Sequence, residues 1–96
     1  MSPGRYRLDL RPRAERQFAG PPRGLPVGAA SAVLEFILGP LLDNPRRVGK
    51  PLRGRYEGQH SARCSAEYRV RYVIDDANGR VTVLDISRRA DTYGVD

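Results

Sequence analysis

The stretch EYRVRYVIDDANGRVTVLDISRRADTY, residues 67–93, predicts two strands joined by a tight turn. Apolar and polar residues alternate on both sides of the turn, which is the period of a half-buried strand. The dipeptide Asn78-Gly79 supplies the residues that a hairpin turn prefers. We therefore expect strands at residues 67–74 and 80–87. Arginines interrupt the first strand and follow the second. We expect arginines in these positions to bind an anionic partner.

The first strand of this hairpin has two chemically different faces, because successive side chains of a strand point to opposite sides. One face carries Tyr68, Val70, Tyr72 and Ile74. The other face carries Arg69, Arg71 and Val73. If the apolar set meets the protein core, the two arginines stand on a face that is open to solvent. We expect Tyr72 to be a core residue.

In the rest of the chain we predict two helices, with one strand before them and one strand after them in the sequence. The segment YRLDL (6–10) alternates like a strand, and Pro12 is a favoured first residue for a helix over PRAERQF. A second helix with a wide apolar face is predicted from residue 28 to about 38, ended or kinked by Gly39-Pro40. Residues 56–64 predict another strand. The order βααβββ indicates an α+β fold, a small, largely antiparallel sheet with both helices on one face.

Length and composition limit the kinds of protein this chain can be. With 96 residues and 40% hydrophobic content, residues 1–96 make a single domain with one core. Cys64 is the only cysteine, so we expect it to be structural, with no internal disulfide, no metal site and no cofactor. The sequence shows no signal peptide and no apolar run long enough to span a membrane. We expect a cytoplasmic protein without a membrane partner.

The positive charge is concentrated in the middle of the chain. The net charge is +6, and all basic residues except Lys50 are arginine, whose planar fork suits phosphate and carboxylate. Residues 46–71 carry eight basic residues against two glutamates, a net charge equal to that of the whole chain. This segregation indicates a phosphate-binding face. Its alternative is an ordinary solvated face. For the basic composition as a whole, the alternatives are an acidic protein partner and, outside this segment, arginines that merely reflect a GC-rich genome. The expected phosphate contacts are Lys50, Arg53, Arg63, Arg71 and Arg88.

Four motifs of the sequence carry a resemblance to a known family. They are GPLLDNPRRVGKPLRG (39–54), HSAR (60–63), YRVRYVID (68–75) and DISRRADTY (85–93). In order and spacing they resemble the RelE branch of the RelE/ParE toxin superfamily, in an actinobacterial style. The resemblance runs from about residue 34 to residue 93.

The resemblance implies the toxin of a type II toxin–antitoxin system with a fold like that of microbial ribonucleases. Such a toxin is a metal-independent endoribonuclease, an mRNA interferase that cleaves translated mRNA in the ribosomal A site and so inhibits translation. Its implied partners are the ribosome, mRNA and a RelB-like antitoxin that silences it in a hetero-oligomer.

The resemblance also implies a set of catalytic residues. Arg69 matches the arginine of the family's YR pair, and Arg89 and Tyr93 match its C-terminal RxxxY motif. Arginines would stabilise the charge that develops on phosphorus, since they do not give up their protons. Tyr93 could act as a base if neighbouring arginines lower its pKa from about 10. His60, with an ordinary pKa of about 6.5, could supply the acid.

Several alternatives stay open at the level of sequence. His60 and Ala62 stand where some family members have lysines, and Gly94 stands where many have arginine. These differences allow a catalytically impaired module that binds only antitoxin or RNA. A ParE-like gyrase inhibitor on the same fold is another candidate. Tyr93 could simply pack over the sheet edge, and Asp85 is either a salt-bridge partner within the sheet or a residue that orients Arg69.

Overall fold

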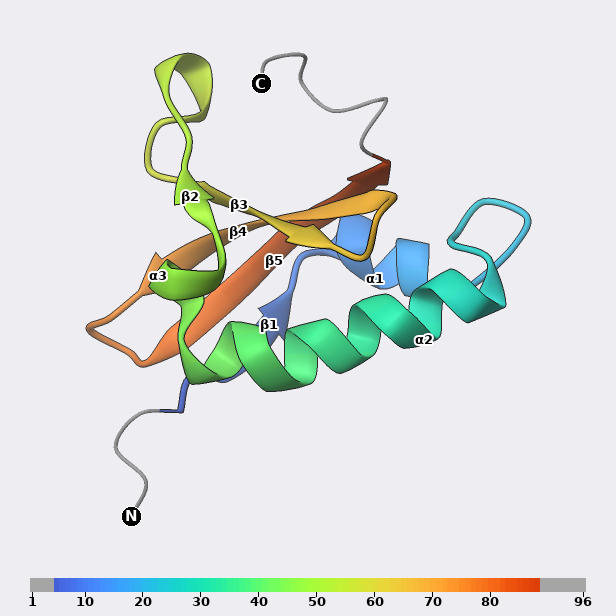
Figure 1. Ribbon diagram of the computed structural model, residues 1–96, viewed down its shortest axis with the longest axis horizontal. Helices are drawn as coiled ribbons and strands as arrows, with labels where there is room; N and C mark the ends of the chain where they lie inside the picture. The colour runs from blue at the N-terminus through green and yellow to red at the C-terminus, as the bar shows by residue number, and fades with distance from the viewer. Residues whose placement is uncertain (1–4, 89–96) are drawn as a thin grey trace.

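The structure, a computed structural model, describes residues 5–88 and contains five strands, three helices and two short helical turns (Figure 1). The strands are β1 (Arg7–Leu10), β2 (Lys50–Pro51), β3 (His60–Cys64), β4 (Tyr68–Asp75) and β5 (Arg80–Arg88). The helices are α1 (Pro12–Phe18), α2 (Val27–Phe36) and α3 (Pro45–Val48). The π-helical turn η1 spans Ile37–Leu41, and the 3-10 turn η2 spans Gly54–Tyr56.

All five strands form one mixed sheet in the order β1-β5-β4-β3-β2. Strand β1 runs parallel to β5, and every other pair of neighbours is antiparallel. The hairpin predicted around Asn78-Gly79 is confirmed, with Asp75 paired to Arg80 across the turn. The α+β class and the largely antiparallel sheet are also confirmed, while the two-residue edge strand β2 adds a strand that the pattern of the sequence did not predict.

The core lies between this sheet and helices α1 and α2, which occupy the same side of it (Figure 1). The predicted apolar face of β4 is confirmed, because Val70 and Tyr72 are fully buried and Tyr68 is 7% exposed. The helical chain contributes mainly the side chains Ala14, Val33, Ile37 and Leu41. On the opposite side of β4, Arg69, Arg71 and Val73 are half-buried. The sheet therefore separates an apolar face from an arginine-bearing face, as the alternation of β4 predicts.

At Gly39-Pro40, where the sequence predicts that the second helix ends or kinks, the regular α-helix α2 has given way after Phe36 to the π-helical turn η1. The chain stays helical through η1, and the Asn44 N–H donates to the carbonyl of Pro40 at 3.1 Å. Proline has no N–H to donate, and the wider π-helical turn accommodates the missing bond without ending the helix. No helix formed by residues 5–88 is long and apolar enough to cross a membrane.

The strand predicted at residues 56–64 is shorter than expected and begins at His60. The residues before it form a closed turn, in which the N–H of Leu52 donates to the carbonyl of Gln59 at 2.8 Å. Helix α3 is a short helix just before β2. It begins with Pro45, whose fixed backbone angle suits the first position of a helix. These elements shape the edge of the sheet at β2.

Helix α1 takes the place of a strand beside the end of β5. Strand β1 ends at Leu10, opposite Val83, so β5 continues beyond its parallel neighbour. There the side chain of Gln17 donates to the carbonyl of Ile86 at 2.6 Å and accepts from the Ile86 N–H at 2.9 Å. One amide side chain thus satisfies both backbone groups of Ile86.

Candidate functional site

Two rows of side chains cross the arginine-bearing face of the sheet. The first row, from β2 to β5, is Lys50, Ser61, Arg71 and Asp85. The second row, from β3 to β5, is Arg63, Arg69 and Ser87. Side chains directly opposite one another in antiparallel strands have Cβ atoms about 5 Å apart. Cations from β2, β3 and β4 therefore gather on one small area of the sheet.

A cleft of about 440 Å³ lies over this area, and we call it the cationic cleft. Its lining residues are Val48, Gly49, Lys50, Pro51, Leu52, Ser61, Arg63 and Arg69. Three of the residues predicted from the sequence, Lys50, Arg63 and Arg69, are thus brought together. Arg69 has Arg63 and Ser87 as its neighbours in register, so two cations face each other across β3 and β4. Like charges directly opposite each other destabilise a sheet, so this arrangement suits an anionic ligand.

At Gly49 the backbone that leads into β2 passes very close to the backbone of β3. A Cβ atom at this position would lie 2.8 Å from the carbonyl oxygen of Ser61 and would also collide with the hydroxyl of Tyr72. Only glycine permits this approach. The next residue, Lys50, is therefore held opposite Ser61, at the rim of the cleft.

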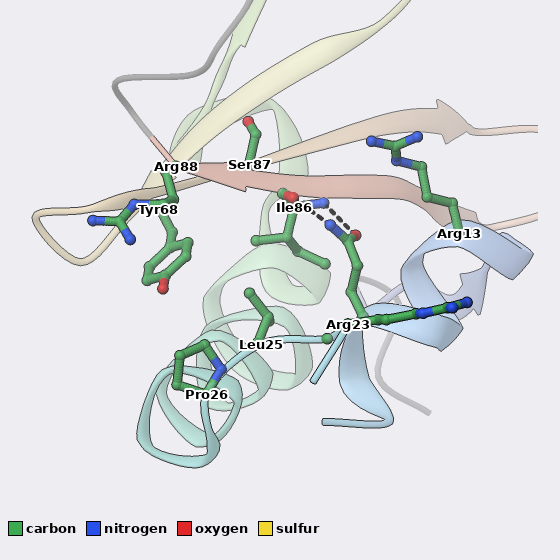
Figure 2. Close-up of a pocket in the computed structure, with 10 residues that line it drawn as sticks. Arg13, Arg23, Leu25, Pro26, Tyr68, Ile86, Ser87 and Arg88 are labelled. Carbon is green, nitrogen blue, oxygen red and sulfur yellow. Dashed lines mark hydrogen bonds between the residues drawn. The ribbon is translucent and has the colours of Figure 1, made fainter. Parts of the chain in front are cut away.

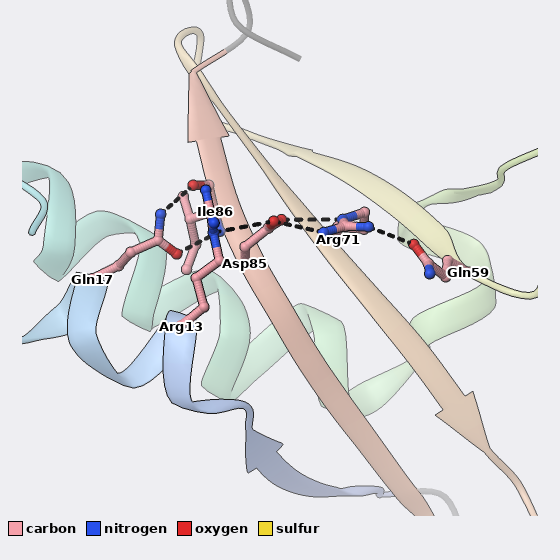
Figure 3. A network of polar contacts seen from close by, with 6 residues as sticks. All are labelled: Arg13, Gln17, Gln59, Arg71, Asp85 and Ile86. Carbon is pink, nitrogen blue, oxygen red and sulfur yellow. Dashed lines mark hydrogen bonds and ion pairs between the residues drawn. The ribbon is translucent and has the colours of Figure 1, made fainter. Parts of the chain in front are cut away.

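Arg71 lies beside the cationic cleft but is held by a carboxylate (Figure 3). Its guanidinium donates to both oxygens of Asp85 at 3.2 and 2.7 Å and to Oε1 of Gln59 at 2.9 Å. It also lies over the ring of Tyr56, 5.3 Å from the centroid. The side chains of Arg71 and Asp85 are only 19% and 13% exposed. Arg71 therefore fastens the sheet to the η2 loop, which differs from the phosphate contact expected from the sequence.

Asp85 is the residue that joins this network to helix α1. The guanidinium of Arg13 lies 3.6 Å from the carboxylate on which Arg71 also converges (Figure 3). Of the two roles considered for Asp85, the salt bridge within the sheet is confirmed, and its partner is Arg71. Sequence reasoning did not single out Tyr56 or Gln59, because nothing in the pattern reveals which strand a loop residue folds against.

His60 lies on the other side of the sheet from Arg69. It is paired with Tyr72, and the two rings stack with centroids 5.6 Å apart. Burial, with a smaller contribution from the charge of Arg46, lowers the pKa of His60 below its ordinary value. Within residues 5–88 its buried Nδ1 has no hydrogen-bond partner. The structure thus does not place His60 with the cleft cations.

The side chains of β3 that do share the face of Arg69 are Ser61 and Arg63. The resemblance described above aligns His60 and Ala62 with lysines of some family members. Ser61 and Arg63 each lie one position further along the strand. A shift of one residue changes the face of a strand. Arg63, directly opposite Arg69, is the β3 cation of this site.

Two further predicted residues, Arg88 and Arg53, do not line the cleft. Arg88 is opposite Tyr68 on the helix side of the sheet, where it lines a separate pocket of about 350 Å³ with Arg23 and Leu25 (Figure 2). Arg53 is exposed on the loop after β2 and does not line the cleft. Arg89 and Tyr93 lie outside the described residues. Residues 5–88 contain no group of three or more His, Cys, Asp or Glu side chains that could hold a metal ion.

The buried hydroxyl of Tyr72 connects the sheet to helix α3. It donates to the carbonyl of Pro45 at 2.6 Å, and burial raises the pKa of Tyr72 to about 12. An unfolded chain releases this proton at about pH 10. The folded chain still holds it there, so the stability it contributes is fully present below about pH 10 and is lost as the pH rises toward 12.

We expect Tyr72→Phe to lose about 1 kcal/mol of unfolding free energy near pH 8, because the carbonyl of Pro45 loses its donor. Above about pH 10 the variant should lose less stability per pH unit than the wild type. Urea unfolding at pH values from about 8 to 11 measures both effects, with Tyr68→Phe as the matched control. Parallel stability curves for the wild type and Tyr72→Phe would contradict this assignment.

Comparison with known proteins places the chain in a family, although it matches no family model. It is 54% identical over 69 residues to the toxin RelE of Mycobacterium tuberculosis, covering 72% of this chain and 70% of that protein. It is 46% identical over 69 residues to the toxin RelG of the same organism, covering 72% of this chain and 78% of the relative. The chain belongs to the RelE toxin family. This confirms the resemblance drawn from its motifs.

Solved structures have the same fold as this RelE-family chain. The M. tuberculosis RelBE2 toxin–antitoxin complex contains a chain that matches with a TM-score of 0.81 and 38% identity, covering 94% of this chain and 98% of the other. The isolated Escherichia coli RelE toxin matches with a TM-score of 0.66 and 26% identity, covering 92% and 90%. The E. coli RelBE complex matches with a TM-score of 0.65 and 27% identity, covering 85% and 94%.

Proposed function

We propose that this RelE-family chain is the toxin of a type II toxin–antitoxin pair and cuts translated mRNA on the ribosome without a metal ion. The observation that supports this proposal is the cationic cleft, in which Lys50, Arg63 and Arg69 converge from three adjacent strands. An RNA backbone presents phosphates, and arginine forks match phosphate oxygens in charge and geometry. The site is therefore suited to hold a scissile phosphate.

Cleavage would proceed by attack of a ribose 2′-oxygen on the adjacent phosphorus. The 2′-hydroxyl loses its proton, a pentacoordinate phosphorane forms, and the bond to the 5′-oxygen breaks as that oxygen takes up a proton. Arg69, supported by Arg63, would stabilise the added negative charge on the phosphorane oxygens. Tyr93 and Arg89, which the resemblance assigns to the same centre, would act as base and as a further clamp.

The protonation of the leaving 5′-oxygen needs a donor other than an arginine, whose pKa is too high for transfer. The position of His60 on the opposite side of the sheet speaks against its proposed role as this acid. Lys50 is the one cleft cation that is not an arginine, and its ammonium carries protons that can be transferred. We assign the acid to Lys50.

A RelB-like antitoxin is the partner expected for such a toxin. Two of the matching solved chains come from toxin–antitoxin complexes. A strongly basic chain with a net charge of +6 is complementary to an acidic antitoxin segment that folds on binding. Action on translating ribosomes would place the toxin in the cytoplasm.

The test is primer-extension mapping of a reporter mRNA in a reconstituted translation system, with and without ribosomes. We expect cuts within the translated region only when ribosomes are present, and we expect Tyr93→Phe to reduce them by about 10²-fold or more, the usual loss when a general base is removed. Absence of cuts with the wild-type protein, or equal cutting by Tyr93→Phe, would argue against this mechanism. DNA damage without mRNA cutting would instead favour gyrase inhibition.

A further inference from the structure

The side chain of Tyr56 contacts Arg71, which lies two residues along β4 from Arg69 of the cationic cleft, and phosphate chemistry does not explain it. It lies on the 3-10 turn η2, in the loop that projects beyond β2 (Figure 1), and the residue is half-exposed. We propose that Tyr56 is a stacking platform for one base of the bound RNA, next to the nucleotide whose phosphate Arg69 holds. This proposal rests on the RNA-cleaving function proposed above and assigns a substrate-binding residue to it.

The loop that carries Tyr56 is held in one conformation by its own hydrogen bonds. The carbonyl of Tyr56 accepts from the N–H of Gln59 at 3.1 Å, and the Gln59 carbonyl accepts from the N–H of Leu52 at 2.8 Å. Gly58 occupies the left-handed region with a φ of +95°, which closes the turn. The ring is therefore positioned before RNA arrives, so that binding costs little ordering entropy.

One guanidinium that lies over the ring has its charge balanced by a carboxylate. Arg71 lies 5.3 Å from the ring centroid and is paired through two hydrogen bonds with Asp85. The guanidinium of Arg71 thus contacts both the carboxylate of Asp85 and the ring of Tyr56. Arg55 is exposed and lies 5.9 Å from the same centroid. An unpaired base stacks well on aromatic rings and on guanidinium planes, and this group offers both.

The spacing along β4 relates this platform to the cleft. Arg69 and Arg71 point to the same face and are two residues apart, which is about 7 Å along a strand. That span is comparable to one nucleotide of an extended RNA strand. A phosphate at Arg69 therefore places the neighbouring base within reach of the ring that Arg71 supports.

A purely structural role for Tyr56, as an anchor of the loop, makes a different prediction, and binding measurements separate the two. The probe is a short, fluorescein-labelled 2′-O-methyl RNA, which cannot be cleaved because it lacks the attacking hydroxyl, measured by fluorescence anisotropy. We expect Tyr56→Leu to raise the Kd about 10-fold or more and Tyr56→Trp to leave it unchanged or lower it. Tyr56→Phe should bind like the wild type. Urea unfolding verifies that each variant is folded.

The decisive comparison uses the same RNA with single abasic positions. At one position, loss of the base should weaken wild-type binding and should make Tyr56→Leu equal to the wild type, because the stacking contact is already gone. If Tyr56→Leu weakens all probes equally, or has no effect while Arg69→Ala abolishes binding, the stacking role is wrong and the RNA-binding cleft stands. If neither variant changes binding, the cleft itself is wrong.

Discussion

Replacing Arg69 by alanine is expected to reduce ribosome-dependent cleavage of mRNA by about 10²- to 10³-fold, the usual loss when a preorganised charge stabiliser is removed from a transition state. Arg69 lines the cationic cleft from β4 and lies opposite Arg63. Arg63 alone cannot hold the phosphorane in the same geometry. Single-turnover cleavage of a reporter mRNA on purified ribosomes measures the rate.

Arg80→Ala is the matched control for this experiment. Arg80 is an exposed arginine on the same sheet, at the turn end of β5, and does not line the cleft. The control variant has the same net charge as Arg69→Ala, and we expect it to cleave mRNA at the wild-type rate. Retention of the wild-type rate by Arg69→Ala itself would remove Arg69 from the mechanism. Equal losses in both variants would mean that total charge matters rather than position.

Replacing Asp85 by asparagine is expected to lower the free energy of unfolding by about 3 kcal/mol, because a half-buried guanidinium loses its counter-charge. Asparagine keeps the size of the side chain, so the loss reports charge and not volume. Arg71 would keep the amide oxygen of Gln59 and the ring of Tyr56, while the new amide would offer it one neutral acceptor oxygen in place of two charged ones. Urea denaturation at neutral pH, followed by circular dichroism, measures the change.

Asp9→Asn provides the control for this prediction. Asp9 is an exposed carboxylate on β1, and its charge is not part of an ion pair between residues 5 and 88. Its replacement should change stability by about 0.5 kcal/mol or less. The double variant Arg71→Met with Asp85→Leu should recover most of the loss, since it removes both charges together. An Asp85→Asn variant as stable as the Asp9 control would show that Arg71 does not depend on this carboxylate.

The pattern of the sequence was sufficient for the hairpin and its faces. Strict alternation in β4 separates Tyr72 from Arg69, and Asn78-Gly79 marks the turn, so both the core side and the cationic side follow from local rules. The charge count then locates the site near β2, β3 and β4. Local patterns are informative here because one face of the sheet is buried and the other is not.

The partner of Arg71 could not be read from the pattern. Counting outward from the turn pairs Tyr72 with Val83 and would place Leu84 opposite Arg71. A register shift between Arg71 and Tyr72 places Asp85 there instead. Such a bulge inserts one residue without a distinctive sequence signal, and it decides which side chain meets the arginine. His60 was misplaced for a related reason, because a difference of one position on β3 moves a side chain through the sheet.

The hydrogen bonds between Gln17 and Ile86 protect a sheet edge that could otherwise promote self-association of the protein. Among residues 5–88, no strand lies beside the outer edge of β5 beyond its pairing with Leu10. An edge with unpaired N–H and carbonyl groups is a template for pairing with another chain. Gln17 occupies these groups at Ile86 with a side chain that cannot continue as a strand. Helix α1 therefore protects the protein from edge-to-edge aggregation where β5 extends beyond its parallel neighbour β1.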